Sequence, residues 1–315
     1  MKNNIICNLL NIRYPIFQGG MAWISDAVLA AAVSEAGGLG IIAAGNAPAD
    51  FVGEQIRKAK SLTDKPFGVN IMLMSPHAEE IAELVADEKV KVVTTGAGNS
   101  GKYMKKWTDA GITVIPVIPS VGLAKMAQRS GAAAVIAEGG ESGGHIGETT
   151  TIALVPQVCD AVDIPVIAAG GIADGRGIAA AFMLGAKGVQ IGTRFLVAKE
   201  CSVHQNYKDK VIKAKDIDTI ATGKRLGHPV RSIKTAFSRG LFAKEYDSSV
   251  SNEELEALGT GALKLAAVDG DLENGCFLAG QIAGLIKKEE TAKEIIEELI
   301  AGIETVFKGA SECLK

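Results

Sequence analysis

Eight short apolar runs, each followed by an amphipathic stretch, recur between residue 14 and about residue 195. The runs are nearly all apolar rather than alternating, which is typical of parallel strands covered on both faces. We expect strands at 14–18, 40–43, 67–72, 90–95, 113–118, 134–138, 165–169 and 188–191, and helices at 26–36, 51–60, 76–87, 101–110, 121–130, 152–162 and 175–184. This order predicts a (β/α)8 barrel, with a doubly wound open sheet as the alternative.

The pattern breaks after Ala198. Residues 201 to about 280 show no strand signal and many polar residues, and 291–307 again form an amphipathic pattern. We therefore expect a barrel at 1–200, completed by a C-terminal helix at about 285–315. A smaller, mainly helical lid domain at 201–284 would be inserted after the eighth strand.

Glycine and polar residues gather where the predicted strands end, and this is the end of a barrel at which ligands bind. The loops after the seventh and eighth strands are the usual phosphate site, with backbone N–H groups and a helix N-terminus as donors. Side-chain amides suit the edge of a heteroaromatic ring. The candidate binding residues are Gln18, Gly20, Met21, Asn70, Glu138, Gly143, Gly144, Gly170, Gly171, Gln190, Gly192 and Thr193.

Segment 137–147 carries five glycines, two carboxylates and one histidine directly after a buried strand. Glycine permits close backbone approach to a ligand, and histidine exchanges protons near neutral pH. His145 is therefore the candidate catalytic residue. His77 fits a surface or capping position, His204 has no motif nearby, and His228 lies in the expected lid, where it could face the site.

Two glycine patterns resemble dinucleotide fingerprints but lack their context. Residues 96–101 fit GxGxxG after a strand, but the next strand ends without an acidic residue for a ribose. Residues 38–43 fit GxGxxA but lead into a strand. A mononucleotide phosphate at the seventh and eighth strands is the better interpretation.

Composition excludes several classes of protein. A net charge of −3 argues against general nucleic-acid binding. Five scattered cysteines without a CxxC pair indicate neither a zinc site nor a disulfide framework, and they suit a reducing cytoplasm. No metal site is expected, and no apolar run is long enough for a signal peptide or a membrane span.

Segment 201–244 is basic, with ten Lys or Arg against three Asp. Its net charge of +7 would attract an acidic protein or the phosphates of a nucleotide. A solvated helical face is the alternative.

Several motifs together resemble the nitronate monooxygenase/2-nitropropane dioxygenase-like flavoprotein family. They are YPIFQGGM at 14–21, GVN at 68–70, GGH at 143–145, AAGGI at 168–172 and QIGTRF at 190–195. Residues 142–147, 214–219 and 227–231 are most similar to its branch of FMN-dependent enoyl-acyl-carrier-protein reductases II.

The resemblance implies FMN as the cofactor and NADH or NADPH as the co-substrate. The FMN phosphate would bind at Gly170, Gly171, Gly192 and Thr193, and the ring would lie near Gly20, Met21, Asn70 and Gln190, with Glu138 and Gly143 lining the mouth. His145 would donate or orient a proton while a trans-2-enoyl thioester is reduced. Acyl carrier protein, which is acidic, would dock on 201–244 of a cytoplasmic homodimer, and a monovalent-cation requirement is left open.

Three other functions compete with this one. The first is a nitronate monooxygenase, in which the histidine acts as a base. The second is a non-catalytic flavin- or phosphate-binding barrel. The third is an inosine-monophosphate-dehydrogenase-like enzyme, which needs a nucleophilic cysteine, and Cys201 is the nearest cysteine to the strand-end loops.

Overall fold

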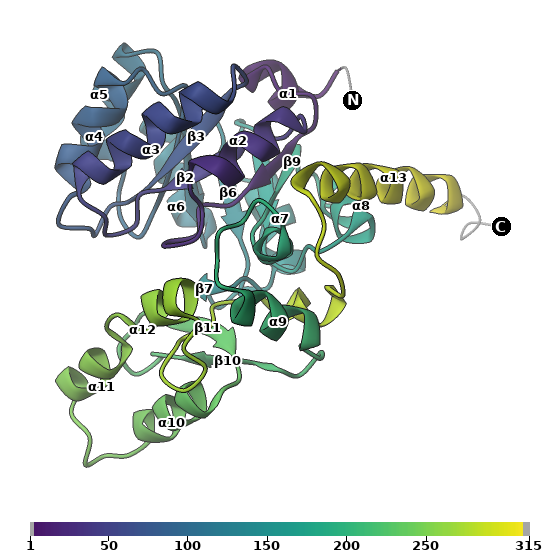
Figure 1. Ribbon diagram of the computed structural model, residues 1–315. Helices are drawn as coiled ribbons and strands as arrows, with labels where there is room; N and C mark the ends of the chain where they lie inside the picture. The colour runs from purple at the N-terminus through teal and green to yellow at the C-terminus, as the bar shows by residue number, and fades with distance from the viewer. Residues whose placement is uncertain (1–2, 311–315) are drawn as a thin grey trace.

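Eight parallel strands form a nearly closed barrel in the computed structural model, which describes residues 3–310 (Figure 1). The strands are β1 (Ile16–Gln18), β2 (Gly40–Ala43), β3 (Phe67–Met72), β4 (Val92–Gly96), β5 (Thr113–Ile118), β6 (Val135–Glu138), β8 (Val166–Ala169) and β9 (Gly188–Ile191). They pair in the order β1-β9-β8-β6-β5-β4-β3-β2, and a parallel bridge between Phe17 and Leu39 brings β1 to the start of β2. The barrel prediction is confirmed, and the open sheet is excluded.

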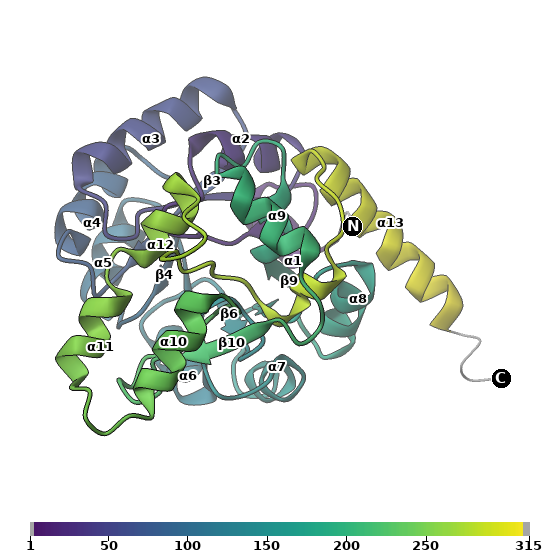
Figure 2. The same ribbon diagram turned by 60° about the horizontal axis from the view of Figure 1, so that its bottom comes forward.

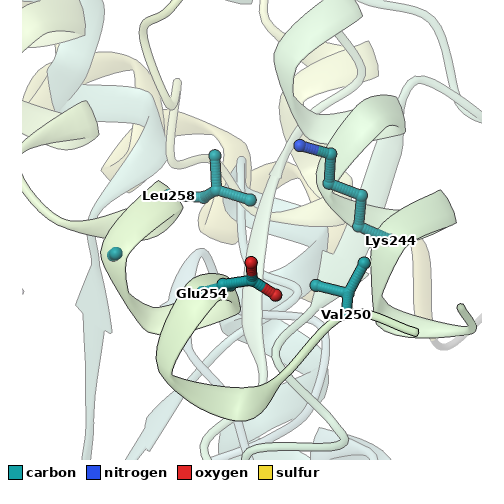
Figure 3. Close-up of a pocket in the computed structure, with 5 residues that line it drawn as sticks. Lys244, Val250, Glu254 and Leu258 are labelled. Carbon is teal, nitrogen blue, oxygen red and sulfur yellow. The ribbon is translucent and has the colours of Figure 1, made fainter. Parts of the chain in front are cut away.

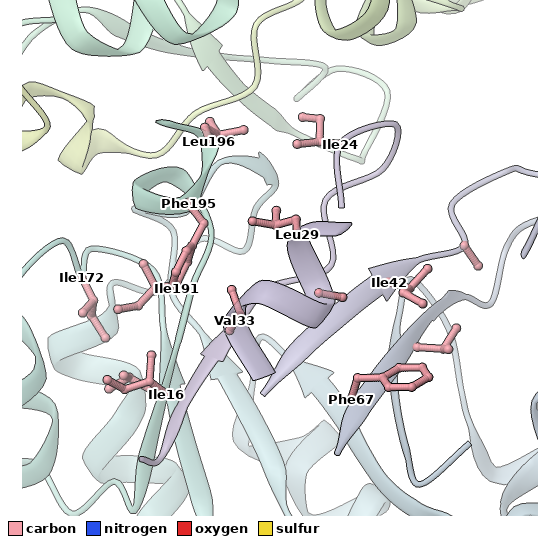
Figure 4. Packing of buried hydrophobic residues seen from close by; sticks show 14 of the residues in the cluster. Ile16, Ile24, Leu29, Val33, Ile42, Phe67, Ile172, Ile191, Phe195 and Leu196 are labelled. Carbon is pink, nitrogen blue, oxygen red and sulfur yellow. The ribbon is translucent and has the colours of Figure 1, made fainter. Parts of the chain in front are cut away.

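The helices cover the outside of the barrel and pack on a continuous apolar layer (Figure 4). They are α2 (Ala27–Glu35), α3 (Ala49–Leu62), α4 (Ala78–Asp87), α5 (Gly101–Asp109), α6 (Val121–Arg129), α7 (Thr151–Cys159), α8 (Gly175–Met183) and α13 (Ala292–Ala310). Leu29 and Val33 of α2 lie in one cluster with Ile16 and Ile191 of the neighbouring strands. The last helix, α13, packs between α8 and α2.

A short helix that the sequence analysis did not predict, α1 (Ile5–Leu10), plugs one end of the barrel. The Asn4 side chain caps it by accepting hydrogen bonds from the N–H groups of Ile6 and Cys7. Apolar residues of α1 share a buried cluster with the inward residues of the strands, such as Phe17 and Ile136. Ligand access is therefore left to the opposite rim, where the strands end.

Residues 201–284, which we call the lid, lie across that rim (Figures 1 and 2). Between η1 (Thr193–Val197) and η3 (Gln281–Leu285), the chain forms α9 (Gln205–Lys213), α10 (Ala236–Glu245), α11 (Asn252–Gly259), α12 (Ala262–Lys264) and the π turn η2 (Leu265–Asp269). None of the helices within residues 3–310 has the length and apolar character that crossing a bilayer requires.

The lid also contains strands, although the sequence analysis found no strand signal there. Strands β10 (Thr219–Thr222) and β11 (Val230–Ile233) pair antiparallel, and β11 also pairs with β7 (Gly144–His145), which comes from the barrel loop after β6. The two lid strands are four residues long and largely half-buried, so they lack the apolar run by which the barrel strands were found.

Candidate active site

The ends of the barrel strands bring the predicted ring-binding residues together at the rim. A Cβ on Gly20 would lie 2.4 Å from the Cβ of Asn70, and one on the preceding glycine would lie 3.2 Å from the Cγ of Gln190. A Cβ on Gly192 would lie 3.5 Å from the Sδ of Met21. Glycine at these positions therefore lets β1, β3 and β9 present their polar side chains in a compact space.

The amide of Gln190 carries an unused hydrogen-bond acceptor. Its Oε1 is buried and has no partner among residues 3–310. Asn70 donates from Nδ2 to the Thr94 hydroxyl at 2.9 Å. A buried acceptor without a partner costs about 1–3 kcal/mol, which an N–H on the edge of a bound ring would recover. These residues fit a flat heteroaromatic ligand.

The phosphate end of the predicted site is built on Gly170 and Gly171, with φ angles of 88° and 70°. Two successive left-handed residues require glycine. Thr193 accepts a hydrogen bond from the Gly280 N–H at 2.9 Å, and its own hydroxyl proton is left for a ligand. A helix N-terminus was expected to donate N–H groups to the phosphate. At the start of α8, the Asp174 side chain already accepts hydrogen bonds from the N–H groups of Arg176 and Gly177.

Gln18 has a different role from the one predicted for its side chain. It is fully buried, and its amide donates to Ser25 Oγ at 2.8 Å and accepts from the Ile41 N–H at 3.1 Å. The side chain spans the junction of β1 and β2 and leaves no exposed surface for a ligand. It stabilises the closure of the barrel instead.

The loop that carries His145 is joined to the lid. His145 pairs with Val230 and Gly144 with Arg231, so a lid strand sets the position of the candidate catalytic residue. A Cβ on Gly143 would lie 2.6 Å from the carbonyl carbon of Ala279. Gly143 is thus required for backbone packing, and its contact with a cofactor stays a prediction.

Two side chains that were not predicted to belong to the site hold this loop. The Glu141 carboxylate accepts hydrogen bonds from the N–H and hydroxyl of Thr151, at 2.9 and 2.8 Å, at the start of α7. Arg231 donates from Nη2 and Nε to the Gly140 carbonyl, at 2.9 and 3.3 Å, and from Nη1 to Thr219 Oγ1 at 3.3 Å. In the sequence, only the motif at 227–231 indicated Arg231. No local pattern indicated that Glu141 would hold the loop.

His145 and His228 face each other at the edge of the site, with ring centroids 6.4 Å apart. Both residues keep exposed surface. Partial desolvation, and then the charge of His228, lower the pKa of His145. The neutral imidazole of His145 therefore predominates at pH 7.

Glu138, at the end of β6, is a second proton-carrying group on the rim. Burial raises its pKa to about 7, while the Ser142 hydroxyl acts in the opposite direction. The Glu138 carboxyl therefore keeps its proton to a higher pH than an ordinary glutamate does.

Among the described residues, the lid cavity, the cysteine nearest the strand-end loops and the metal-ligating residue types offer no second catalytic site. A surface cavity of about 360 Å³ lies within the lid, between α10 and α11, and is lined by Lys244, Val250, Glu254, Ala257 and Leu258 (Figure 3). Cys201 is buried, and burial raises the pKa of its thiol to about 11, so it is a poor nucleophile. Within residues 3–310 no cluster of three or more His, Cys, Asp or Glu could hold a metal ion.

The basic segment is less available than its charge suggests. Lys208 is buried and donates to the Ala198 carbonyl and to Glu289, at 2.8 and 2.7 Å. Arg231 binds the His145 loop. Residues 245–284 carry eight Asp or Glu against one Lys, so the net positive charge of the lid lies in its first half. Lys215, Lys224 and Arg239 remain exposed in that half.

Comparison with known proteins identifies the family of this chain. The nitronate monooxygenase family matches residues 3–88 and 80–302. The chain belongs to this family. It is therefore an oxidoreductase, and the resemblance seen in its motifs is confirmed.

The members of the family that resemble this chain differ in their named activities. FabK from Thermotoga maritima has 49% sequence identity and a TM-score of 0.96, covering 98% of this chain and 99% of its own. A (3aS,4S,5R,7aS)-5-hydroxy-7a-methyl-1-oxo-octahydro-1H-indene-4-carboxyl-CoA dehydrogenase from Rhodococcus jostii is 35% identical, covering 94% of each. A probable nitronate monooxygenase from Staphylococcus saprophyticus is 33% identical, covering 94% of this chain and 96% of its own.

Proposed function

We propose that this family member is an FMN-dependent enoyl-acyl-carrier-protein reductase that uses NADH or NADPH. The observation that carries the proposal is the His145 loop, held by a lid strand beside a rim built for a flat ring. The similarity to FabK over nearly the whole chain supports the enoyl reductase branch.

The residues of the rim fit FMN. We propose that its phosphate is held at Gly170, Gly171, Gly192 and Thr193, and its ring by Gly20, Met21, Asn70 and Gln190. The unpartnered Gln190 Oε1 is the observation that favours a bound ring. When bound, FMN supplies the transfer of hydride from the nicotinamide to the β-carbon of the enoyl thioester.

The chain supplies positioning and a proton. The lowered pKa of His145 keeps its imidazole neutral, so a ring N–H can donate to and orient the thioester carbonyl. Glu138, with a pKa of about 7, lies on the same rim and can hold a proton. The α-carbon of the substrate must finally receive such a proton. Arg231 and Glu141 keep the loop in place while this happens.

A first experiment measures the cofactor and the reaction. The purified protein should show flavin absorbance at close to one FMN per chain. Without oxygen, it should oxidise NADH or NADPH only when a crotonyl thioester is present. A protein that binds no FMN even after reconstitution would overturn the proposal.

Nitronate oxidation is the second candidate, because a neutral His145 is also suited to act as a base. Aerobic turnover of propionate 3-nitronate, faster than anaerobic reduction of the crotonyl thioester, would favour it. His145→Ala should abolish either reaction. Full activity in that variant would show that His145 is not required for catalysis.

We further propose that acyl carrier protein docks on the exposed cations of the first half of the lid. Replacing Lys215, Lys224 and Arg239 by Glu should raise KM for an acyl-carrier-protein substrate by about tenfold or more and leave KM for the CoA thioester unchanged. Lys125→Glu, at an exposed site on α6, is the matched control. An equal effect on both substrates would exclude docking there.

Three points stay predictions: that residues 201–284 form a separate domain, that the protein is a homodimer, and that it requires a monovalent cation. Light scattering tests the assembly, and turnover in potassium, ammonium or tetramethylammonium chloride tests the cation.

A further inference from the structure

Trp23, in the loop after β1, has an unusual backbone conformation. Its φ of 64° lies in the left-handed region, where a bulky side chain is disfavoured. Asn11 and Lys89 share a positive φ, but they follow the ends of α1 and α4, where it is common, and Ala97, after β4, has a small side chain. Trp23 ends no helix, and its loop is fixed by a hydrogen bond from the Met21 N–H to Ser25 Oγ at 2.9 Å. The loop therefore holds the Trp23 backbone in a conformation that is unfavourable for a bulky residue.

The Trp23 ring lies at the surface and touches the lid. It is 47% exposed, whereas the other tryptophan, Trp107, is fully buried in the barrel. The Lys264 ammonium lies 5.1 Å from the centroid of the Trp23 ring, a distance at which cation–π attraction operates. The contact joins the first barrel loop to α12, which lies on the barrel side of the lid (Figures 1 and 2).

The lid segment that follows Lys264 is also irregular and apolar. It continues as the π turn over Leu265–Asp269, and such turns are rare and often occur at functional sites. Leu265 is 37% exposed and Val268 is 51% exposed. Exposed apolar side chains that follow Lys264, the residue in contact with Trp23, provide a surface for an aliphatic ligand.

The position of Trp23 links this surface to the active site. Its loop starts at Gly20, which lies against Asn70 at the ring-binding rim. We propose that Trp23 and lid residues 264–268 form the subsite for the acyl chain of the substrate. Trp23 packs along the chain beyond the reacting double bond, and Lys264 holds its ring in that orientation. The inference rests on the proposed reduction of enoyl thioesters and specifies where chain length is recognised.

A chain-length series tests the subsite. The holoenzyme is assayed anaerobically with trans-2-enoyl-CoA thioesters of four to ten carbons. Each buried methylene is worth about fourfold in binding, so kcat/KM of the wild type should rise with length. Trp23→Ala should lower the ten-to-four-carbon ratio of kcat/KM at least tenfold and change the four-carbon value less than threefold. Lys264→Gln should lower the same ratio less.

Met74→Ala is the matched control, because Met74 is 75% exposed in the loop after β3, on the same rim. It should leave the ratio unchanged. An equal loss at every chain length in Trp23→Ala, or an unchanged ratio, would overturn the proposal.

Tryptophan fluorescence gives a readout that needs no turnover. Trp23 is the exposed one of the two tryptophans, so its emission should shift to the blue when decanoyl-CoA binds, and butyryl-CoA should cause little shift. Trp23→Phe should remove the response. The same response to both thioesters, or none, contradicts the acyl subsite. If the wild type reduces no enoyl thioester, the proposed function fails, and the fluorescence still decides whether Trp23 contacts an acyl chain.

Discussion

Substitution of Arg231 gives the strongest test of the idea that the lid positions the loop that carries His145. Arg231→Met keeps an unbranched apolar stem but removes the donors to Gly140 and Thr219. The 2.9 Å bond to Gly140 is charge-assisted, and such bonds contribute about 1.5–3 kcal/mol. The two 3.3 Å bonds add little. Desolvation lowers the pKa of the guanidinium, so part of this gain is offset.

We therefore expect the free energy of unfolding to fall by about 1–2 kcal/mol in Arg231→Met. The larger effect should be on catalysis, because a displacement of about 1 Å at a reacting group can cost about a hundredfold. Urea unfolding measures the first effect, and anaerobic reduction of crotonyl-CoA measures the second. Hydrogen exchange in 139–147 should become faster.

Arg239→Met is the matched control for this variant. Arg239 lies on α10 in the same lid and is exposed, and its side chain makes no hydrogen bond or ion pair within the described part of the chain. It should match the wild type in all three measurements. If Arg231→Met also keeps wild-type turnover and loop exchange, the lid does not position His145 through this contact.

Three further predictions concern residues at the strand ends. Gln18→Leu should lower the free energy of unfolding by about 2–4 kcal/mol, whereas Gln190→Leu should leave it nearly unchanged and weaken FMN binding, as urea unfolding and flavin titration will show. Gly20→Ala should lose flavin absorbance, because its Cβ would lie 2.4 Å from Asn70; a fully loaded variant would refute the ring site. The raised pKa of Glu138 favours its protonated form in the folded state, so its contribution is present below the ordinary pKa of 4.5 and is lost as pH rises through about 7. Glu138→Gln should remove about 1–3 kcal/mol of that pH dependence, measured by unfolding between pH 4.5 and 7.5, and flatten the alkaline decline of turnover.

The barrel and its ligand-binding end could be predicted because they depend on local patterns. An apolar run between two polar turns identifies a buried parallel strand, and the carboxyl ends of such strands meet at one rim. Gly20, Asn70 and Gln190 were predicted by that rule, and the structure places Gly20 against Asn70 and Gly19 against Gln190 at the same rim. Their contact with a ring stays a prediction. Gln18 follows the same rule and has another role, because a glutamine at a strand end looks the same in sequence whether its amide faces a ligand or the next strand.

The parts that were missed depend on contacts between distant segments. Strand β7 has two residues and exists because β11, from the lid, pairs with it. Glu141 and Arg231 bind partners that are distant in sequence, and both contacts include main-chain groups, of Thr151 and Gly140, which carry no sequence signal. Lys208 was counted as a surface charge, but its ammonium is buried against Glu289, and a charge count cannot distinguish the two.

The pairing of β7 with β11 also determines how the lid can work. A lid that only covered the rim could move away and leave the catalytic groups in place. Here His145 lies on the strand that pairs with the lid, whereas Glu138 and Gln190 belong to the barrel. Any outward movement of β11 must break the hydrogen bonds of β7 or carry His145 away from the rim. If His145 and Glu138 act on the substrate as proposed, substrate entry and assembly of these two groups are coupled, because the same pairing holds the lid and the histidine.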